Sequence, residues 1–352
     1  MAEGLQIALL DLDNAPLEEL LLGWGQPAYR ARQLWGWIYA RLTEDFDAMT
    51  DLPQPLRDRL AREATIHSLR PLAETASPDG LTRKVLFELR DGETIESMLM
   101  HYEGRHTACI SVQVGCAIGC PFCATGQGGL VRNLTAGEIV GQVLSFARQL
   151  ARQGERLSNV VVMGMGEPLA NYEATWGALE RLMDEGGLNL GARRITLSTA
   201  GVVPGIHRLA DQDTQMRLAV SLHAPTDELR NQLVPLNRRY GLAQLLAACR
   251  AYQGRTGRRI SFEYALINGL NDSPAQARQL AHLLRGLLTH VNLIPLNPIA
   301  EFPYGPSPPG RIKAFREELT RLEVSHTLRQ SRGAEIQAGC GQLRSRQPSK
   351  SV

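Results

Sequence analysis

The chain has 352 residues, 43% of them hydrophobic and 21% charged, a composition that predicts a folded protein with one large domain and a smaller accessory region. Its longest apolar runs, such as 160–163 and 291–296, are far shorter than the roughly 18 residues of a membrane span, and its start lacks the pattern of a secretory signal. We therefore expect a cytoplasmic protein without membrane association, and a net charge of only +2 does not by itself indicate nucleic-acid binding.

The first part of the chain predicts a small helical domain followed by a β-hairpin. Its expected elements are two helices, at 27–42 and 53–64, and two strands, at 84–89 and 94–100. Asp91 and Gly92 separate the two strands, and this dipeptide favours the positive φ angles of a tight hairpin turn. We divide this region into a helical accessory domain, 1–80, and a hairpin extension, 81–106, that leads into the core.

The middle of the chain alternates short β-branched runs with longer amphipathic stretches, which is typical of βα units around a parallel sheet. The expected strands are 108–114, 159–163, 194–198, 216–222, 259–265 and 291–296. The expected helices are 135–152, 172–185, 242–253 and 274–288. Six units are too few for a closed eight-unit barrel, so the sequence predicts an α/β fold with a partial, open parallel β/α barrel over 107–300. In such a barrel, functional residues gather at the carboxyl ends of the strands.

The last fifty residues predict a helix and a loop. FPYGPSPPG contains too much Pro and Gly to be helical, and a helix is expected again at 311–322. We treat 301–343 as a C-terminal region that ends in a cysteine-containing loop, and we expect the polar tail 344–352 to be disordered.

Three of the six cysteines lie close together, with C-x3-C-x2-C spacing: Cys116, Cys120 and Cys123. Thiolates are the usual ligands of iron–sulfur clusters, and three of them leave one iron of a [4Fe–4S] cluster free to bind another molecule. The alternative is zinc, which normally requires a fourth Cys or His, and the position of Cys109 does not complete a standard zinc knuckle. The spacing therefore predicts an iron–sulfur cluster.

Several residues that could bind a small molecule follow predicted strands. They occur in GMGEP, ITLSTAG, AVSLHAP and LIPLNP, and the candidates are Gly166, Glu167, Ser198, Ser221, Leu222, His223 and Asn297. Each of the polar residues alone is more often a turn or capping residue, but together they predict one site at the carboxyl edge of the sheet. His223 has no second histidine beside it, so we expect contact with a ribose or carboxylate rather than metal binding.

The cysteine motif, with Phe122 before its last cysteine, resembles the radical S-adenosylmethionine (SAM) superfamily. The resemblance implies that the open iron binds the amino and carboxylate groups of SAM. It also implies that one electron from the cluster cleaves the sulfonium bond of SAM and releases a deoxyadenosyl radical. The equivalent of GMGEP in that superfamily binds the methionine amino group, which matches Gly166 and Glu167 in this chain.

The chain as a whole is similar to one family, the bacterial adenosine-C2 methyltransferases of 23S rRNA and tRNA. The similar segments are YRARQLWGWIY, TACISVQVGCAIGCPFCATGQGGLVRNL, VVMGMGEPLANY, ITLSTAG, SLHAPTDELR, EYALINGLNDS, NLIPLNP and AGCGQL. This resemblance implies methylation of carbon 2 of adenosine in the peptidyl-transferase centre of 23S rRNA and beside the anticodon of tRNA. It also implies that the helical domain 1–80 helps to bind RNA.

The same resemblance assigns roles to residues that the cluster motif leaves unexplained. Two SAM molecules are used in each turnover: Cys340 takes the methyl group of the first, and the radical from the second activates that S-methylcysteine for bonding to adenine. Cys109 then attacks the sulfur of Cys340, forming a disulfide that releases the base from a transient protein–RNA adduct. Glu96 accepts the proton from carbon 2, although Glu93 is a nearby competitor. Cys249, on a predicted helix, is expected to be a core residue.

Two alternatives remain open at this stage. The related antibiotic-resistance enzymes methylate carbon 8 of the same rRNA adenosine with the same cysteines, but Pro168 and the AGCGQL ending favour carbon 2. A noncatalytic iron–sulfur RNA-binding protein would not need the GMGEP motif or Cys340.

The arginines of 255–259 are either solvated charges or RNA contacts. We further expect an electron donor such as flavodoxin, a monomeric protein, and a Cys340 loop slightly loosened by Gly339, where the family more commonly has alanine.

Overall fold

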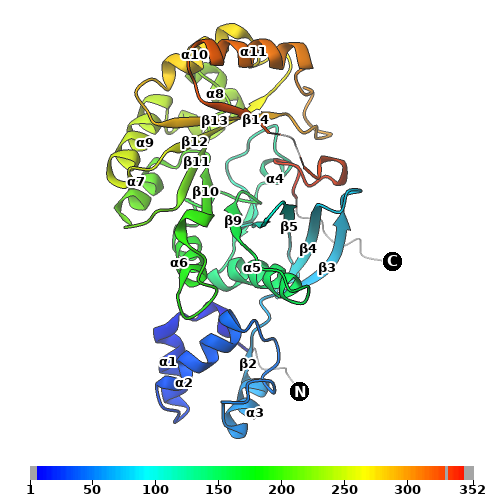
Figure 1. Ribbon diagram of the computed structural model, residues 1–352, viewed down its shortest axis with the longest axis vertical. Coiled ribbons are helices and arrows are strands. Elements are labelled where there is room, and N and C mark those ends of the chain that lie inside the picture. Colours follow the sequence, from blue (N-terminus) through cyan, green and yellow to red (C-terminus); the bar gives the residue numbers. More distant parts are fainter. Residues whose placement is uncertain (1–5, 330–331, 345–352) are drawn as a thin grey trace.

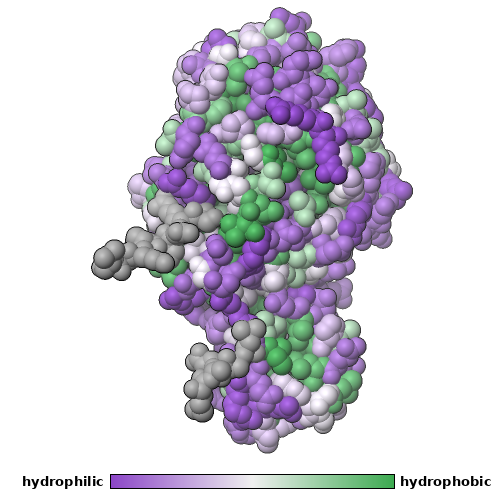
Figure 2. Space-filling view, turned by 180° about the vertical axis from the view of Figure 1, so that it is seen from behind, coloured by the Kyte–Doolittle hydropathy of each residue, from purple (hydrophilic) through white to green (hydrophobic). Residues whose placement is uncertain are grey.

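The architecture was analysed in a computed structural model, which describes residues 6–329 and 332–344. All of the expected disordered tail except Arg344 lies outside the described residues. Figure 1 shows a large α/β body with a small helical body at one end. Figure 2, seen from behind, shows a mostly hydrophilic surface that narrows between the two bodies.

The small body is the N-terminal region. It contains β1 (Ile7–Ala8), α1 (Asn14–Gly23), α2 (Tyr29–Trp35), a π-helical turn (Gly36–Ala40), α3 (Gln54–Glu63) and β2 (Ala64–Thr65). It is joined to the large body through α6 (Tyr172–Met183): Arg181 Nε donates to Asp13 Oδ1 at 2.6 Å, and Trp35 Nε1 donates to Asp184 Oδ1 at 3.1 Å. The predicted helices at 27–42 and 53–64 are confirmed, although the first ends in the π turn and α1 was not predicted.

The large body is built on one ten-stranded sheet with the order β14-β13-β12-β11-β10-β9-β6-β5-β4-β3. Its strands are β3 (Leu69–Ala76), β4 (Thr82–Leu89), β5 (Thr94–Tyr102), β6 (Arg105–Cys109), β9 (Asn159–Val162), β10 (Ile195–Thr199), β11 (Arg217–Ser221), β12 (Ile260–Leu266), β13 (Thr289–Pro295) and β14 (His326–Leu328). From β6 to β14 all neighbours are parallel, and β3 to β6 pair antiparallel. The predicted α/β class with a parallel core sheet and the predicted hairpin are confirmed.

The helices follow one another around the outside of the curved sheet, from green α5 to orange α11 (Figure 1). Besides α6 they are α5 (Ala136–Ala151), α7 (Val203–Asp211), α8 (Asp227–Leu233), α9 (Leu242–Thr256), α10 (Pro274–Leu283) and α11 (Pro309–Arg321). The short α4 (Ala124–Gln127) instead follows Cys123 directly and lies beside the C-terminal loop. Both α5 and α10 begin with a capping box, formed by Thr135 with Glu138 and by Ser273 with Gln276. No helix in the described part of the chain is both long and apolar enough to cross a bilayer.

The predicted strand 108–114 is wrong as a single element. The chain leaves the large sheet after Cys109, and β7 (Gln113–Gly115) pairs with β8 (Leu130–Asn133) in a separate two-stranded sheet. The backbone N–H groups of Val112 and Gln113 both donate to the carbonyl of Met165, so this segment bonds to the turn after β9 instead of continuing the ladder. Because 107–116 is buried throughout, its pattern does not reveal the break.

Candidate active site

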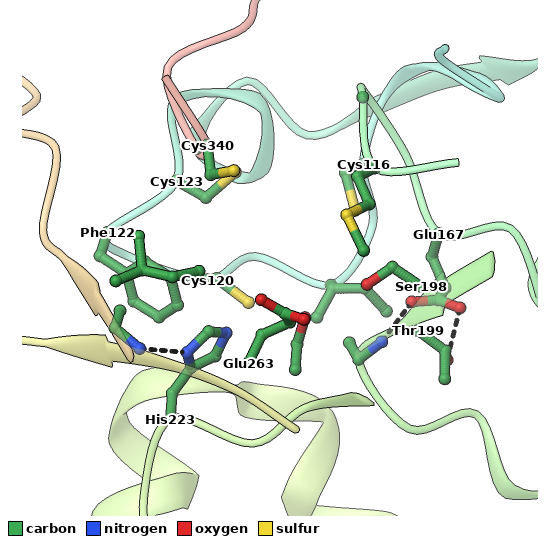
Figure 3. Close-up of a pocket in the computed structure, with 18 of the residues that line it drawn as sticks. Cys116, Cys120, Phe122, Cys123, Glu167, Ser198, Thr199, His223, Glu263 and Cys340 are labelled. Atoms are coloured by element: carbon green, nitrogen blue, oxygen red, sulfur yellow. Dashed lines mark hydrogen bonds between the residues drawn. The ribbon is translucent and has the colours of Figure 1, made fainter. Parts of the chain in front are cut away.

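One pocket opens at the carboxyl ends of the parallel strands (Figure 3). It brings together most of the predicted site residues: Cys116, Cys120, Cys123, Gly166, Glu167, Ser198, Ser221, His223, Asn297 and Cys340. Three predicted residues do not line it: Cys109, Glu96 and Leu222. Since the lining residues come from the cysteine loop, the ends of six strands and the C-terminal loop, the fold alone brings them together.

The cysteine loop is held in shape by its own backbone. Gly115 has φ +77°, and a Cβ at this position would lie 1.9 Å from the carbonyl oxygen of Gly129, so only glycine fits. The N–H of Cys116 donates to the same carbonyl at 2.7 Å. Burial raises the pKa of Cys116 to about 12 and that of Cys120 well above its usual value, so thiolates here require a bound cation.

This donor set fits an iron–sulfur cluster. Three soft thiol ligands face one side of a pocket that has space beyond them, which suits a cluster with one open iron. Cys109, the fourth thiol considered for zinc, does not line the pocket. The side chain of Cys249 is fully buried on α9, as expected for a core residue.

A buried arginine supports the wall beside Cys120. Arg230 on α8 is fully buried and donates to the carbonyls of Leu222 at 3.1 Å, Ser221 at 3.0 Å and Ala200 at 2.7 Å. It has no carboxylate ion-pair partner among the described residues, and burial lowers its pKa to about 10 while the nearby Cys120 opposes that shift. Leu222 therefore contributes through its backbone, and the guanidinium places a positive charge near the cluster ligands.

The GMGEP turn is fixed by Glu167. Its Oε1 accepts from Thr199 Oγ1 at 2.7 Å and from the N–H of Leu169 at 3.1 Å, and its Oε2 accepts from the N–H of Ala200 at 2.7 Å (Figure 3). Burial raises the pKa of Glu167, and these hydrogen bonds oppose the rise. The carboxylate thus braces the turn against β10 at the wall of the pocket.

His223 is held as a neutral hydrogen-bond donor. It has φ +59°, which is uncommon outside glycine, and its Nδ1 accepts from the N–H of Ala265 at 3.0 Å. Burial, followed by the charge of Arg230, lowers its pKa to about 3. With Nδ1 accepting, the proton lies on Nε2, so the neutral ring offers an N–H donor at the pocket.

The loop that carries Cys340 is tied to both sides of the pocket. Asn297 Nδ2 donates to the carbonyl of Cys340 at 3.0 Å, and the N–H of Ala124 donates to the carbonyl of Gly341 at 2.7 Å. A Cβ on Gly339 would lie 2.6 Å from Asn297 Nδ2. The missing side chain of Gly339 therefore allows Asn297 to approach the loop, and the expectation that Gly339 loosens this loop stays a prediction.

Cys340 faces two groups that were not predicted, Glu263 and Arg329. Asn292 Nδ2 donates to Glu263 Oε1 at 2.7 Å, and Arg329 lies 3.4 Å from Glu263 Oε2. Although Cys340 is accessible, the surrounding protein raises its pKa, and the positive charge of Arg329 opposes this rise. Glu263 lies within the EYALINGLNDS segment, but Arg329 belongs to none of the quoted motifs, so only the fold reveals its position.

Cys109 ends β6 behind the pocket wall. Its pKa is raised to about 12, mainly by burial and to a smaller extent by the thiol of Cys340. All six cysteines are free thiols in this structure, so the expected Cys109–Cys340 disulfide is not present here.

Glu96 lies on β5 beneath the end of the C-terminal loop, with only 3% of its surface exposed. Its Oε1 is 3.0 Å from Lys84 Nζ, and its Oε2 accepts from the N–H of Arg344 at 3.0 Å. Lys84 also donates to the carbonyl of Gln337 at 3.2 Å. Glu96 therefore contacts the segment that carries Cys340. Its competitor Glu93 lies at the hairpin turn instead.

Comparison with known proteins decides the family. Residues 7–66 match the ribosomal RNA large subunit methyltransferase N-terminal domain, and residues 110–281 match the radical SAM superfamily. A Symbiobacterium thermophilum protein named probable dual-specificity RNA methyltransferase RlmN is 50% identical over 94% of this chain and 89% of its own length. The chain belongs to the RlmN family. Dual-specificity RNA methyltransferase RlmN 1 of Myxococcus xanthus is 51% identical over 96% of this chain and 94% of its own.

A solved structure supports the same conclusion. The crystal structure of a radical SAM methyltransferase from Sphaerobacter thermophilus is 55% identical to this chain, has a TM-score of 0.93 and covers 96% of this chain and 99% of its own. The predicted resemblance and the radical SAM type of the fold are therefore confirmed. As an RlmN-family member the chain is a radical SAM RNA methyltransferase, and its superfamily uses a [4Fe–4S] cluster and SAM.

Proposed function

We propose that this protein methylates carbon 2 of adenosine in 23S rRNA and in tRNA, through an S-methylcysteine on Cys340. The observation that carries the proposal is that Cys340 lines the same pocket as the three cluster cysteines and Glu167. Carbon 2 of adenine is electron-poor and does not displace a methyl group from SAM, so a radical route and a protein-bound methyl carrier are needed. The dual-specificity names of the relatives support both RNA substrates.

In this proposal Cys116, Cys120 and Cys123 hold the cluster, and Gly166, Glu167, Ser198, Ser221, His223 and Asn297 surround SAM. When bound, these cofactors supply a deoxyadenosyl radical by one-electron cleavage of the sulfonium. The fixed Nε2–H of His223 donates to a ligand oxygen, and the braced Glu167 turn receives the ammonium end. Asn297 positions the Cys340 loop through its hydrogen bond to the Cys340 carbonyl.

The protein residues then act in sequence. Cys340 receives a methyl group from one SAM, and after a hydrogen atom has been removed from that methyl group, its carbon bonds to adenine. A one-electron acceptor takes the unpaired electron of this adduct, and Glu96 takes the proton from carbon 2. The thiolate of Cys109 then attacks the Cys340 sulfur and breaks the sulfur–carbon bond to RNA. The released carbon takes up a proton to become the methyl group, and a reductant later opens the Cys109–Cys340 disulfide. The electrostatic interaction between the two thiols supports this pairing.

The remaining assignments complete the proposal. A flavodoxin-like electron donor supplies the electrons, and two SAM molecules are consumed in each turnover. The enzyme acts as a monomer in the cytoplasm, where reducing conditions keep its thiols free. The helical domain 1–80 helps to grip the RNA, the hairpin 81–106 and barrel 107–300 form the core, and 301–343 delivers Cys340.

Anaerobic reconstitution tests the proposal. The protein loaded with iron and sulfide is incubated with SAM, a reductant and RNA, and the nucleosides are analysed by mass spectrometry. We expect 2-methyladenosine together with 5′-deoxyadenosine. Finding 8-methyladenosine would overturn the carbon-2 assignment in favour of the resistance-type activity, and a protein that forms no deoxyadenosine would be a noncatalytic RNA-binding protein.

A further inference from the structure

A positively charged surface lies at the edge of the parallel sheet opposite to the edge where the pocket opens. Five arginines occur where strands β6, β10, β11 and β12 begin: Arg105, Arg194, Arg217, Arg258 and Arg259. We call this surface the arginine edge. Parallel strands all begin at the same edge, so residues far apart in the chain meet there.

The strand register places these arginines side by side. Thr196 pairs with Arg217, and Ala219 pairs with Ser261, so Arg194, Arg217 and Arg259 begin three neighbouring strands. Arg105 begins β6, two positions in the sheet from β10. With strands about 4.8 Å apart, the arginine edge extends over roughly 20 Å.

The charges of the arginine edge are not neutralised by the protein. None of its five arginines has an ion-pair partner among the described residues, and four of the side chains are exposed. Two nearby acids are already occupied, because Asp211 pairs with Arg255 and Glu155 pairs with His106. Two exposed acids in adjoining loops, Asp213 and Glu103, also form no ion pair with the edge.

Two further observations concern the charges of this edge and their lack of partners. Burial, and then the charges of the other four arginines, lower the pKa of Arg217. The Nε of the partly buried Arg258 has no hydrogen-bond partner. A cluster of like charges destabilises the folded protein unless a polyanion binds to it, and a row of guanidinium groups is suited to phosphate oxygens.

We propose that the arginine edge is a second RNA-docking surface that binds phosphates of the substrate outside its methylated loop. This inference rests on the proposed function, since it takes RNA as the partner. The seven residues of β12 span about 23 Å at 3.3 Å per residue, so an RNA that fills the pocket must extend at least this far to touch the edge. We therefore expect the arginine edge to bind a large folded RNA and not a short hairpin.

The test compares three triple variants of the full-length protein. The edge variant is Arg194→Gln/Arg217→Gln/Arg259→Gln, and its charge-conserving partner replaces the same residues with lysine. The matched control Arg278→Gln/Lys313→Gln/Arg321→Gln removes three exposed basic side chains that already form ion pairs with Glu317 or Glu318. Both glutamine variants lose the same net charge, so only the position differs.

Binding is measured by fluorescence anisotropy on full-length tRNA, on a 23S rRNA domain transcript and on an isolated anticodon stem-loop. On at least one of the two larger RNAs we expect the edge variant to bind about tenfold or more weakly at 0.1 M salt, with the slope of log Kd against log salt reduced by about two. The lysine variant, the control and the stem-loop should stay within about twofold of wild type. Unchanged binding of both large RNAs, or an equal loss in the control or on the stem-loop, would overturn the docking surface.

Methylation separates this inference from the proposed function. At saturating RNA, the edge variant should methylate at the wild-type single-turnover rate, because the pocket is untouched, while its KM rises with its Kd. A wild-type protein that makes no 2-methyladenosine would refute the proposed function. The binding comparison would still decide whether the arginine edge contacts RNA.

Discussion

The two edges of the parallel sheet differ in how their polar and charged side chains are buried and paired. At the carboxyl edge, polar groups are buried and satisfied: three donors hold Glu167, and backbone carbonyls surround Arg230. At the amino edge the arginines are mostly exposed, and none forms an ion pair within the described chain. The first arrangement fixes geometry for chemistry, whereas the second leaves charge available for a large anion. Changes at the carboxyl edge should therefore affect chemistry or folding, and changes at the amino edge should affect RNA affinity.

The largest difference between the effect on methylation and the effect on RNA affinity is expected for Cys340→Ala. This variant should reduce methylation to background, while RNA affinity stays at the wild-type level. The variant removes the methyl carrier but no RNA contact of the arginine edge. Mass spectrometry of nucleosides and anisotropy on the same preparation measure the two properties.

Cys109→Ala should instead leave protein joined covalently to RNA, visible as a shifted band on denaturing gels. Cys249→Ala, which removes a buried thiol outside the pocket, serves as the control and should still release methylated product.

A smaller but still large loss is expected for Glu96→Gln. If Glu96 removes the carbon-2 proton, the single-turnover rate should fall by about 10²- to 10⁴-fold. Glu93→Gln at the hairpin turn is the matched control and should react normally. Since Glu96 also pairs with the buried Lys84, urea unfolding must be measured in parallel. A variant that accumulates the protein–RNA adduct has lost proton removal, and one that retains the wild-type rate shows that another group is the base.

A substitution of Gly166 tests how closely the backbone at the carboxyl edge is packed. Gly166 has φ +100°, and a Cβ there would lie 2.9 Å from the backbone nitrogen of Gln113. Gly166→Ala should therefore lower the free energy of unfolding by about 2–3 kcal/mol and weaken SAM binding. Gly177→Ala on α6, where a Cβ meets nothing within 4 Å, should raise that free energy by about 0.5–1 kcal/mol. Equal free energies of unfolding of the two variants would contradict the close packing of Gly166 against Gln113.

The sequence revealed the carboxyl edge much better than the amino edge. The cysteine spacing, GMGEP and the strand-end positions led to nine residues that do line the pocket, because chemistry requires particular side chains at short spacings, and the family resemblance added Cys340. The arginines of the other edge come from four separate strands: the run 255–259 marks only two of them, and only the order of the strands in the sheet places all five along one edge. The break after Cys109 was also missed, because a segment buried on all sides shows no alternation.

Among the changes at the carboxyl edge, the smallest expected effect is a pH dependence. The pKa of His223 is about 3 in the folded protein and about 6.5 when unfolded, so the unfolded chain binds more protons between these values. Stability is therefore lost as pH falls below about 6.5, and this group alone should cost about 2 kcal/mol between pH 7 and pH 5.

His223→Asn isolates this effect, because asparagine tolerates the positive φ and can accept the Ala265 N–H in place of Nδ1. Urea unfolding at pH 7 and pH 5 should show the variant losing about 2 kcal/mol less than wild type. His101 and His290, whose pKa values burial also lowers, are present in both proteins, so their contributions cancel in the difference. A difference near zero would mean that His223 accepts a proton in the folded protein, and its role as a fixed Nε2 donor to a ligand would then be lost.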